Sequence, residues 1–175
     1  MKPEQRKEYL VEAENQRVIA VARQAELAKN KKELEQGLHD SLDRAAMEQG
    51  HSCSTQNSPK AWENAKALIK SFPQSSLSRI EHGATFKMTI TNTEDNSIEE
   101  SGDHTFIDPS HPSYPILQAL EDGRTNLPAV PKGMPGYFSA NSAIGKLIKG
   151  QTSGYTATHS DFDDQEIKIT ICEIE

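Results

Sequence analysis

The hydrophobic pattern begins with a long polar stretch in which apolar residues are sparse but periodic. Residues 4–36 contain no glycine or proline and are dominated by Glu, Lys, Arg, Gln, Ala and Leu, so their summed propensity predicts one long helix. The apolar residues of this helix form two narrow stripes, and the second is shifted in register relative to the first. The first stripe is Val11, Val18, Ala22 and Ala25, and the second is Leu27, Leu34, Leu38 and Ala45. A seam this narrow is typical of a two-stranded coiled coil. The second strand is either another molecule or a returning helix.

A candidate for the returning helix follows a run of turn-forming residues at 50–58. Ser58 is placed to cap this helix and Pro59 to occupy its first position. The next apolar residues have spacings of 3, 4 and 3 before a proline ends the helix: Trp62, Ala65, Ile69, Phe72 and then Pro73. This helix is much shorter than the first. The chain therefore turns either at 50–58 or already near Gly37, and the sequence leaves both placements open.

After residue 73 the pattern changes to that of strands and turns. Phe86, Met88 and Ile90 alternate with polar residues, which predicts a half-buried strand. Residues 94–97 predict a turn, and 104–108 predict a short strand.

The last third of the chain contains a predicted loop and a predicted hairpin. Residues 108–136 hold six prolines, so we expect mainly loop there, around a helical turn at 116–120. Residues 155–159 and 165–174 are expected to pair as a final hairpin. The second of these strands has three isoleucines on one face: Ile167, Ile169 and Ile171.

The charge and the cysteine content exclude several classes of protein. The chain has 19 basic and 26 acidic residues, a net charge of −7, which argues against a protein that coats nucleic acid by gripping phosphates. Any contact with RNA or DNA is therefore expected to be indirect, through a partner. Cys53 and Cys172 are too few for a disulfide framework or a Cys-rich zinc site. The longest apolar run of the first helix has five residues, against about 20 for a membrane span, so we expect a cytoplasmic protein without a signal peptide.

The most informative stretch is 137–154. Its physical interpretation is a strand that ends at Ser139, a short helix capped by Asn141 or Ser142, and a stop at Gly150. Ile144, Leu147 and Ile148 form one apolar stripe. Lys146 and Lys149 lie in the last turns, where the helix dipole favours cations. A short amphipathic helix that only connects two strands, with no binding role, would show the same features.

The order of residues in this stretch resembles the C-terminal domain of the bacterial Gre transcript-cleavage factors. Six residues fall on the family motif without a gap: Ser142, Ile144, Gly145, Lys146, Gly150 and Gly154. Ala143 stands where the family prefers proline, Tyr155 replaces an acid, and Lys149 changes the polarity of the helix.

The resemblance implies an α+β fold with an N-terminal antiparallel α-helical coiled-coil hairpin, 1–73, followed by a small FKBP-like β-rich domain, 74–175. It implies a monomer that binds RNA polymerase and regulates transcription elongation. The C-terminal domain would dock at the rim of the secondary channel, and the coiled coil would enter that channel. The residues implied in docking are those of the motif helix: Ser142, Ile144, Gly145, Lys146, Leu147 and Gly150.

In the family, two carboxylates at the tip of the coiled coil help to hold a Mg²⁺ ion in the active site of the polymerase. The polymerase then hydrolyses backtracked RNA. Asp40 and Asp43 keep the family's separation of three residues but lie two positions further from Gly37. Solvated helix acids are the favoured interpretation of this pair over the metal role. If the turn lies at 50–58, the nearest acids are Glu48 and Glu63 instead. The protein itself is expected to be no enzyme and to have no cofactor of its own.

The alternative function is a coiled-coil interaction or dimerisation module with an FKBP-like docking domain and no role in cleavage. In that case the narrow stripe would pair between molecules. Other residues receive ordinary interpretations: His51 and Cys53 belong to a polar loop, Cys172 is a small buried residue, and Trp62 packs in the helical seam. Residues 101–111 contain Ser, His and Asp but lack the pattern of a hydrolase.

Overall fold

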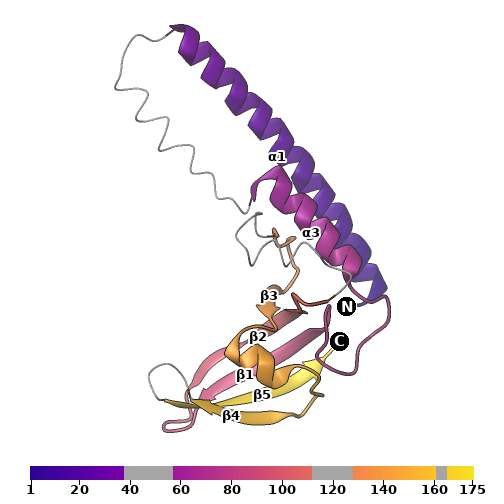
Figure 1. Cartoon of the computed structure of the whole chain (residues 1–175), viewed down its shortest axis with the longest axis vertical. Coiled ribbons are helices and arrows are strands. Elements are labelled where there is room, and N and C mark those ends of the chain that lie inside the picture. Colours follow the sequence, from indigo (N-terminus) through magenta and orange to yellow (C-terminus); the bar gives the residue numbers. More distant parts are fainter. Residues whose placement is uncertain (38–56, 112–127, 161–164) are drawn as a thin grey trace.

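The structure, a computed structural model, describes residues 1–37, 57–111, 128–160 and 165–175. It has a helical arm and a β-rich head (Figure 1). The arm consists of α1, Pro3–Gly37, and α3, Pro59–Ser71. Among its described residues, the head contains five strands and one short helix: β1 Thr85–Asn92, β2 Ile98–Ile107, β3 Gly136–Ser139, α5 Ala143–Ile148, β4 Thr156–Ser160 and β5 Glu166–Ile174. The predicted α+β class is confirmed.

Both arm helices form where their local signals predict them. The Ser58 side chain accepts a hydrogen bond from the Ala61 amide at 3.1 Å, and Pro59 occupies the first turn of α3. Phe72 has extended backbone angles after the last turn, as expected for a residue that precedes a proline. The capping prediction is therefore confirmed.

The two helices run in opposite directions along each other. The Arg6 guanidinium near the start of α1 donates to the carbonyls of Ile69 and Lys70 at the end of α3, at 3.1 and 2.7 Å. Further along α1, Glu14 forms an ion pair with Lys66. Residues 38–56, which connect α1 to α3 in the sequence, lie outside the described residues, so neither of the two predicted placements of the turn is tested.

The seam between the helices is made of alanines and one tryptophan. Ala13 and Ala20 of α1 pack with Trp62, and Ala61, Ala65 and Ala129 complete the cluster. The predicted place of Trp62 is confirmed. The predicted stripe does not pack on the returning helix α3, because Val11 and Val18 are 54% and 55% exposed; its pairing with another molecule stays a prediction. Alanine gives a weak hydrophobic signal, yet it lets two helices approach closely.

The predicted slip of register is also explained by this seam. Leu27 follows Ala20 by seven residues, as Ala20 follows Ala13. These three residues therefore share one face of α1. At about 100° per residue, Val11 and Val18 lie on the opposite face. The sequence contains two separate stripes, not one stripe that changes register.

The head is built around a mixed sheet in the order β3-β2-β1-β5-β4. The β1–β2, β1–β5 and β4–β5 pairs are antiparallel, whereas β2 and β3 are parallel. The predicted final hairpin is confirmed. β2 is longer than the predicted strand at 104–108, because its polar first half pairs with β1 despite lacking an apolar alternation. The predicted helical turn at 116–120 lies outside the described residues.

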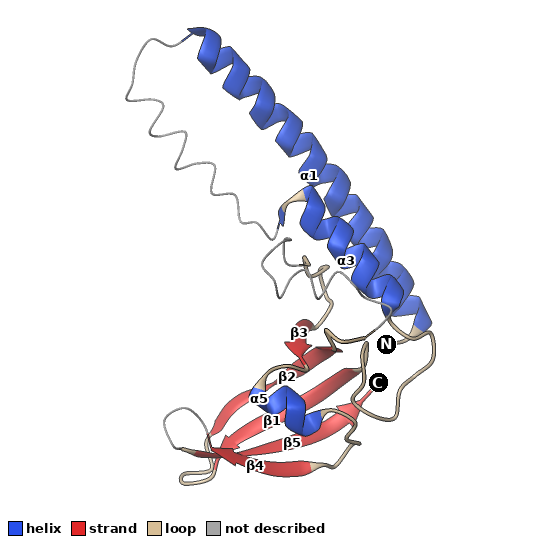
Figure 2. Ribbon diagram, in the orientation of Figure 1, coloured by secondary structure: helices blue, strands red, loops and turns tan. Residues whose placement is uncertain are grey.

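One face of the sheet forms the core of the head, and α5 covers it (Figure 2). Phe86 and Met88 of β1, Phe106 of β2 and Ile148 of α5 are buried together, with Ile167, Ile169 and Ile171 of β5. The prediction that Cys172 is buried is wrong, because the residue is exposed. Cys172 lies at an irregularity in the pairing of β1 with β5, where Lys87 pairs with Glu173 and Met88 pairs with Ile171.

A second apolar cluster joins the arm to the head. Met1, Leu68, Ile69 and Phe72 from the arm end pack against Ile107 and Met134 of the head. Beyond this base, the described side chains at 21–32 of α1 are all exposed. The 35 residues of α1 correspond to about 52 Å of helix, and Figure 1 shows it extending away from the sheet. No helix in the described ranges has the length and apolar character that a membrane span requires.

Candidate protein-binding site

The motif helix α5 is fixed at its start by a serine. The Ser142 hydroxyl accepts a hydrogen bond from the Gly145 amide at 2.9 Å and donates to the Ser139 carbonyl at 2.8 Å. These bonds satisfy a backbone donor at the helix end and hold it against the end of β3. Of the two predicted caps, the structure selects Ser142.

Two of the three motif glycines, Gly145 and Gly150, have structural reasons to be glycine. A Cβ atom on Gly145 would lie 2.0 Å from the Ser139 carbonyl oxygen, closer than any real contact. Gly150 has a φ of +79°, and its amide donates to the Ile80 carbonyl at 2.8 Å. Both glycines therefore shape the backbone of the segment, and its side-chain surface comes from other residues.

The remaining predicted docking residues divide between core and surface. Ile144 and Leu147 are half-buried and pack against the core of the head, whereas Lys146 is exposed. The segment therefore presents Lys146 beside the outer edges of two aliphatic side chains. Such a combination suits a protein surface with an acidic group next to an apolar patch.

Lys149, the residue that follows α5, forms an ion pair within the head. The Lys149 ammonium lies 2.7 Å from the carboxylate of Asp108, which is only 8% exposed. Burial raises the pKa of Asp108, but hydrogen bonds from Lys149 and Ser110 outweigh burial and hold that pKa below its ordinary value. Lys149 thus ties the end of α5 to the end of β2.

A buried histidine connects the arm to the head next to this ion pair. His82 Nδ1 accepts a hydrogen bond from the Asp108 amide at 3.2 Å, and its Nε2 lies 2.8 Å from the Ser71 hydroxyl at the end of α3. Its ring stacks on His111 and meets the edge of Phe72. Burial, followed by the charge of His111, lowers the pKa of His82 to about 4. The imidazole is therefore neutral at pH 7.

The contact between Ser71 and His82 does not make a nucleophile. The Ser71 hydroxyl donates to the Leu68 carbonyl at 2.6 Å, and His82 Nδ1 is an acceptor. The ring proton therefore sits on Nε2, which donates to Ser71 instead of removing its proton. The sequence offered no signal for this connection, because its partners are 11 and 26 positions away from His82.

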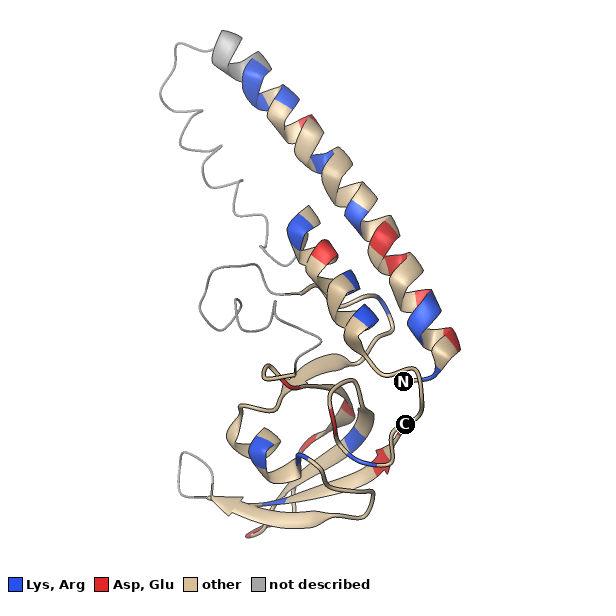
Figure 3. Cartoon of the chain, turned by 45° about the vertical axis from the view of Figure 1, so that its right-hand side comes forward, with Lys and Arg blue, Asp and Glu red and all other residues tan. Residues whose placement is uncertain are grey.

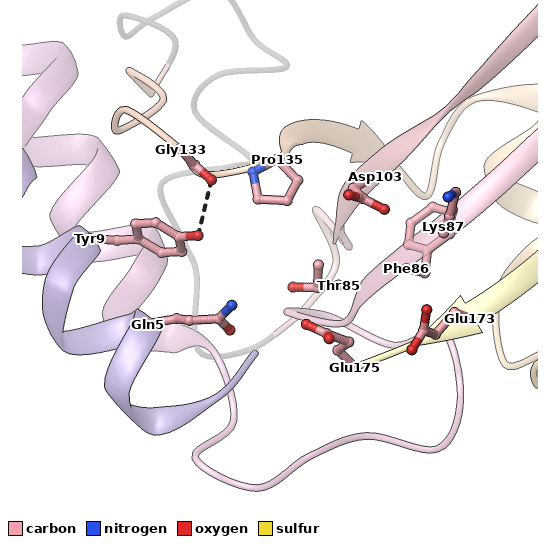
Figure 4. Close-up of a pocket in the computed structure, with 10 residues that line it drawn as sticks. All are labelled: Gln5, Tyr9, Thr85, Phe86, Lys87, Asp103, Gly133, Pro135, Glu173 and Glu175. Carbon is pink, nitrogen blue, oxygen red and sulfur yellow. Dashed lines mark hydrogen bonds between the residues drawn. The ribbon is translucent and has the colours of Figure 1, made fainter.

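A cavity of about 310 Å³ lies between the base of the arm and the head (Figure 4). The Tyr9 hydroxyl of α1 closes one side by donating to the Gly133 carbonyl at 3.1 Å. On the sheet, Lys87 lies in register between Asp103 and Glu173. The other lining residues are Gln5, Thr85, Phe86, Pro135 and Glu175. The lining is polar, and its carboxylates outnumber its single lysine.

The predicted metal-assisting acids, Asp40 and Asp43, fall outside the described residues, so their geometry is not tested. Among the residues that are described, no group of three His, Cys, Asp or Glu side chains is placed to hold a metal ion. Along the described arm, charges of both signs are interspersed (Figure 3). Hydrogen bonds from Arg17 and Lys66 lower the pKa of Glu14 to about 2.

Comparisons with known proteins find similarity to solved structures alone: no family model matches the chain, and no curated protein matches it. One similar structure is GreA factor homolog 1 (Gfh1) of Thermus thermophilus, with 14% identity, 95% of this chain and 94% of that chain covered, and a TM-score of 0.30. Another is Gfh1 of Thermus aquaticus, with 14% identity, 97% and 95% coverage, and a TM-score of 0.33. Because these TM-scores are low, the functional argument rests on the residues described above.

Proposed function

We propose that this protein regulates transcription elongation by binding RNA polymerase, with the head docked at the rim of the secondary channel and the arm inside it. The observation that carries the proposal is the pairing of a projecting helix with the motif segment at 142–150. α1 supplies about 52 Å of reach. Its antiparallel packing with α3 supplies stiffness, so the arm would act as a coiled-coil hairpin on an FKBP-like head.

In the docked complex, Lys146 would make the polar contact to the polymerase, and the outer edges of Ile144 and Leu147 would make the apolar one. Gly145, Gly150 and Ser142 would hold the segment in shape. The docking segment would hold only the head on the polymerase. The direction of the arm would then depend on the base of the arm, where Met1 and Phe72 pack on the head.

A pull-down with core RNA polymerase tests the docking surface. We expect Lys146→Glu to reduce retention at least fivefold, because it reverses the exposed charge of the segment. Lys168→Glu is the matched control, since Lys168 is also exposed but lies on β5. Wild-type protein that is not retained at all would remove the proposal. Equal loss in both variants would show that the segment is not the docking surface.

Stimulation of RNA cleavage is a separate part of the proposal. Asp40 and Asp43 would supply hard oxygen ligands to a Mg²⁺ ion of the polymerase, and the chain itself would bring no cofactor. The assay is RNA shortening in stalled elongation complexes, with wild type compared with Asp40→Ala/Asp43→Ala. Shortening that depends on these acids supports the metal role. Binding without shortening would mean that the protein occupies the channel and does not assist catalysis.

A further inference from the structure

The sheet of the head has two edges that differ in their protection. An edge strand exposes unpaired backbone groups, and proteins usually protect it with charged side chains, proline, a bulge or a covering element. On one side of the sheet, β3 covers only the second half of β2, and the first half carries Glu100 and Asp103 and an irregular register with β1. The other edge is β4, on the outside of the sheet (Figure 1).

β4 has none of these protections. It contains no proline and no Lys, Arg, Asp or Glu. Its pairing with β5 runs without a bulge, from Thr156 opposite Thr170 to Ser160 opposite Glu166. Within the part of the chain that the structure describes, no further strand pairs with it. This edge is therefore available to an added strand.

The hydrogen bonds to β5 show which backbone groups of β4 point outward. The Ile171 amide of β5 donates to the Tyr155 carbonyl at 2.9 Å, so the Tyr155 carbonyl points towards β5. Backbone groups alternate in direction along an antiparallel strand, and those of every second residue of β4 therefore point away from the sheet. The outward residues are Thr156, Thr158 and Ser160. Each offers one N–H donor and one carbonyl acceptor to a further strand.

The side chains beside the edge indicate which kind of strand fits. Ala157 and His159 are half-buried and pair with two isoleucines of the core. An added strand would therefore place every second side chain beside the apolar face of the sheet and the others on its exposed face. Residues 74–175 carry 15 acidic and 7 basic residues. Charge complementarity thus favours Lys or Arg at the exposed positions of the added strand and disfavours a second acidic head.

We propose that β4 binds an extended segment of another protein, in which apolar residues alternate with Lys or Arg, and adds it to the sheet as a further strand. The outward backbone groups of β4 bind the backbone of the segment, and the alternation of its side chains supplies specificity. The site is separate from the motif segment at 142–150. This binding therefore goes beyond polymerase docking and does not depend on it.

An NMR titration of the full chain, without polymerase, tests the site. The probe is a capped seven-residue peptide in which valine alternates with lysine. We expect this peptide to shift the amide resonances of Thr156, Thr158 and Ser160 and to slow their hydrogen exchange. A peptide with glutamate in place of lysine should bind about fivefold more weakly. If the lysine peptide shifts none of these three amides, the proposal is overturned.

Two changes test whether backbone pairing is responsible. Methylation of alternate peptide amides removes their donors and leaves the protein unaltered, and it should weaken binding about tenfold. Thr158→Pro removes an outward N–H group and keeps the bonds to β5, so it should weaken binding to a similar extent. The matched control is Ser101→Pro on the other edge, where the N–H group points away from β1, because that of Phe106, five positions later, donates to the carbonyl of Ala84 on the β1 side.

Three results would refute strand addition at β4. The first is a methylated peptide that binds as tightly as the unmethylated one, and the second is Thr158→Pro that binds as tightly as Ser101→Pro. The third is slow exchange of the Thr158 amide that appears without peptide and increases with protein concentration, because it would assign the edge to a second copy of the chain.

Discussion

Acid should weaken the joint between arm and head through His82. The side chain is 3% exposed and its pKa is lowered to about 4 from an ordinary value of 6.5. The unfolded chain therefore binds a proton at pH 5 that the folded chain does not bind. A group with this shift contributes stability that is fully present above pH 6.5 and is lost as the pH falls towards 4.

The size of the effect follows from the shift in pKa. A difference of about 2.5 units corresponds to about 3 kcal/mol when the pH is below both values, at about 1.4 kcal/mol per unit. At pH 4.5 most of this loss is already present. The physical cause is that an imidazolium in this position would be buried and would turn a second N–H group towards the Asp108 amide.

Urea unfolding between pH 7.5 and 4.5 measures this loss. Fluorescence of Trp62, the single tryptophan, reports on the arm seam, and circular dichroism reports on the whole chain. Because carboxylates also titrate in this range, the decisive quantity is the difference between wild type and His82→Phe. The variant should be less stable at pH 7.5 by about 1–3 kcal/mol, since it leaves the Asp108 amide without its acceptor, but its stability should fall less with acid.

The control for this experiment is His159→Gln, which removes a histidine from β4, outside the joint; the change in pH dependence should be larger for His82→Phe than for this control. If His82→Phe and wild type lost stability in parallel between pH 6.5 and 4.5, the assignment of His82 as a buried neutral group would be refuted.

Three further substitutions test the motif segment. Gly145→Ala should lower the free energy of unfolding by about 3 kcal/mol in urea titrations, because its Cβ would collide with the Ser139 carbonyl; an unchanged urea midpoint would contradict the close approach. Ser142→Ala should cost about 1 kcal/mol in the same assay through loss of the cap, and a neutral result would show that the cap is dispensable. Lys149→Met should raise the pKa of Asp108, measured by NMR titration, because burial is then no longer opposed by the ion pair; a pKa that does not rise would rule out this role of Lys149.

The elements with strong local signals could be predicted from the sequence. α3 has a serine cap, a proline in its first turn and a proline after its end, so its bounds follow from local chemistry alone. β5 has isoleucines at every second position, and its buried face follows from that alternation. The start of α5 was likewise restricted to two neighbouring residues.

The features that sequence analysis missed depend on tertiary contacts. The valines of α1 have the stronger hydrophobic signal, but the alanines form the seam, because the closeness of α3 favours small side chains. The first half of β2 has no apolar alternation and becomes a strand because β1 provides a pairing edge. The joint through His82 brings together residues from the arm, the loop before β1 and the end of β2, which no local pattern predicts.

The most direct test of the polymerase proposal is where the arm lies in a complex. A photoreactive phenylalanine analogue at Arg23, an exposed position on α1 beyond the end of the seam, would be irradiated in the presence of core RNA polymerase. We predict crosslinks to the segments of the polymerase that line the secondary channel. Crosslinks confined to the outer surface of the polymerase, at full binding, would contradict the account.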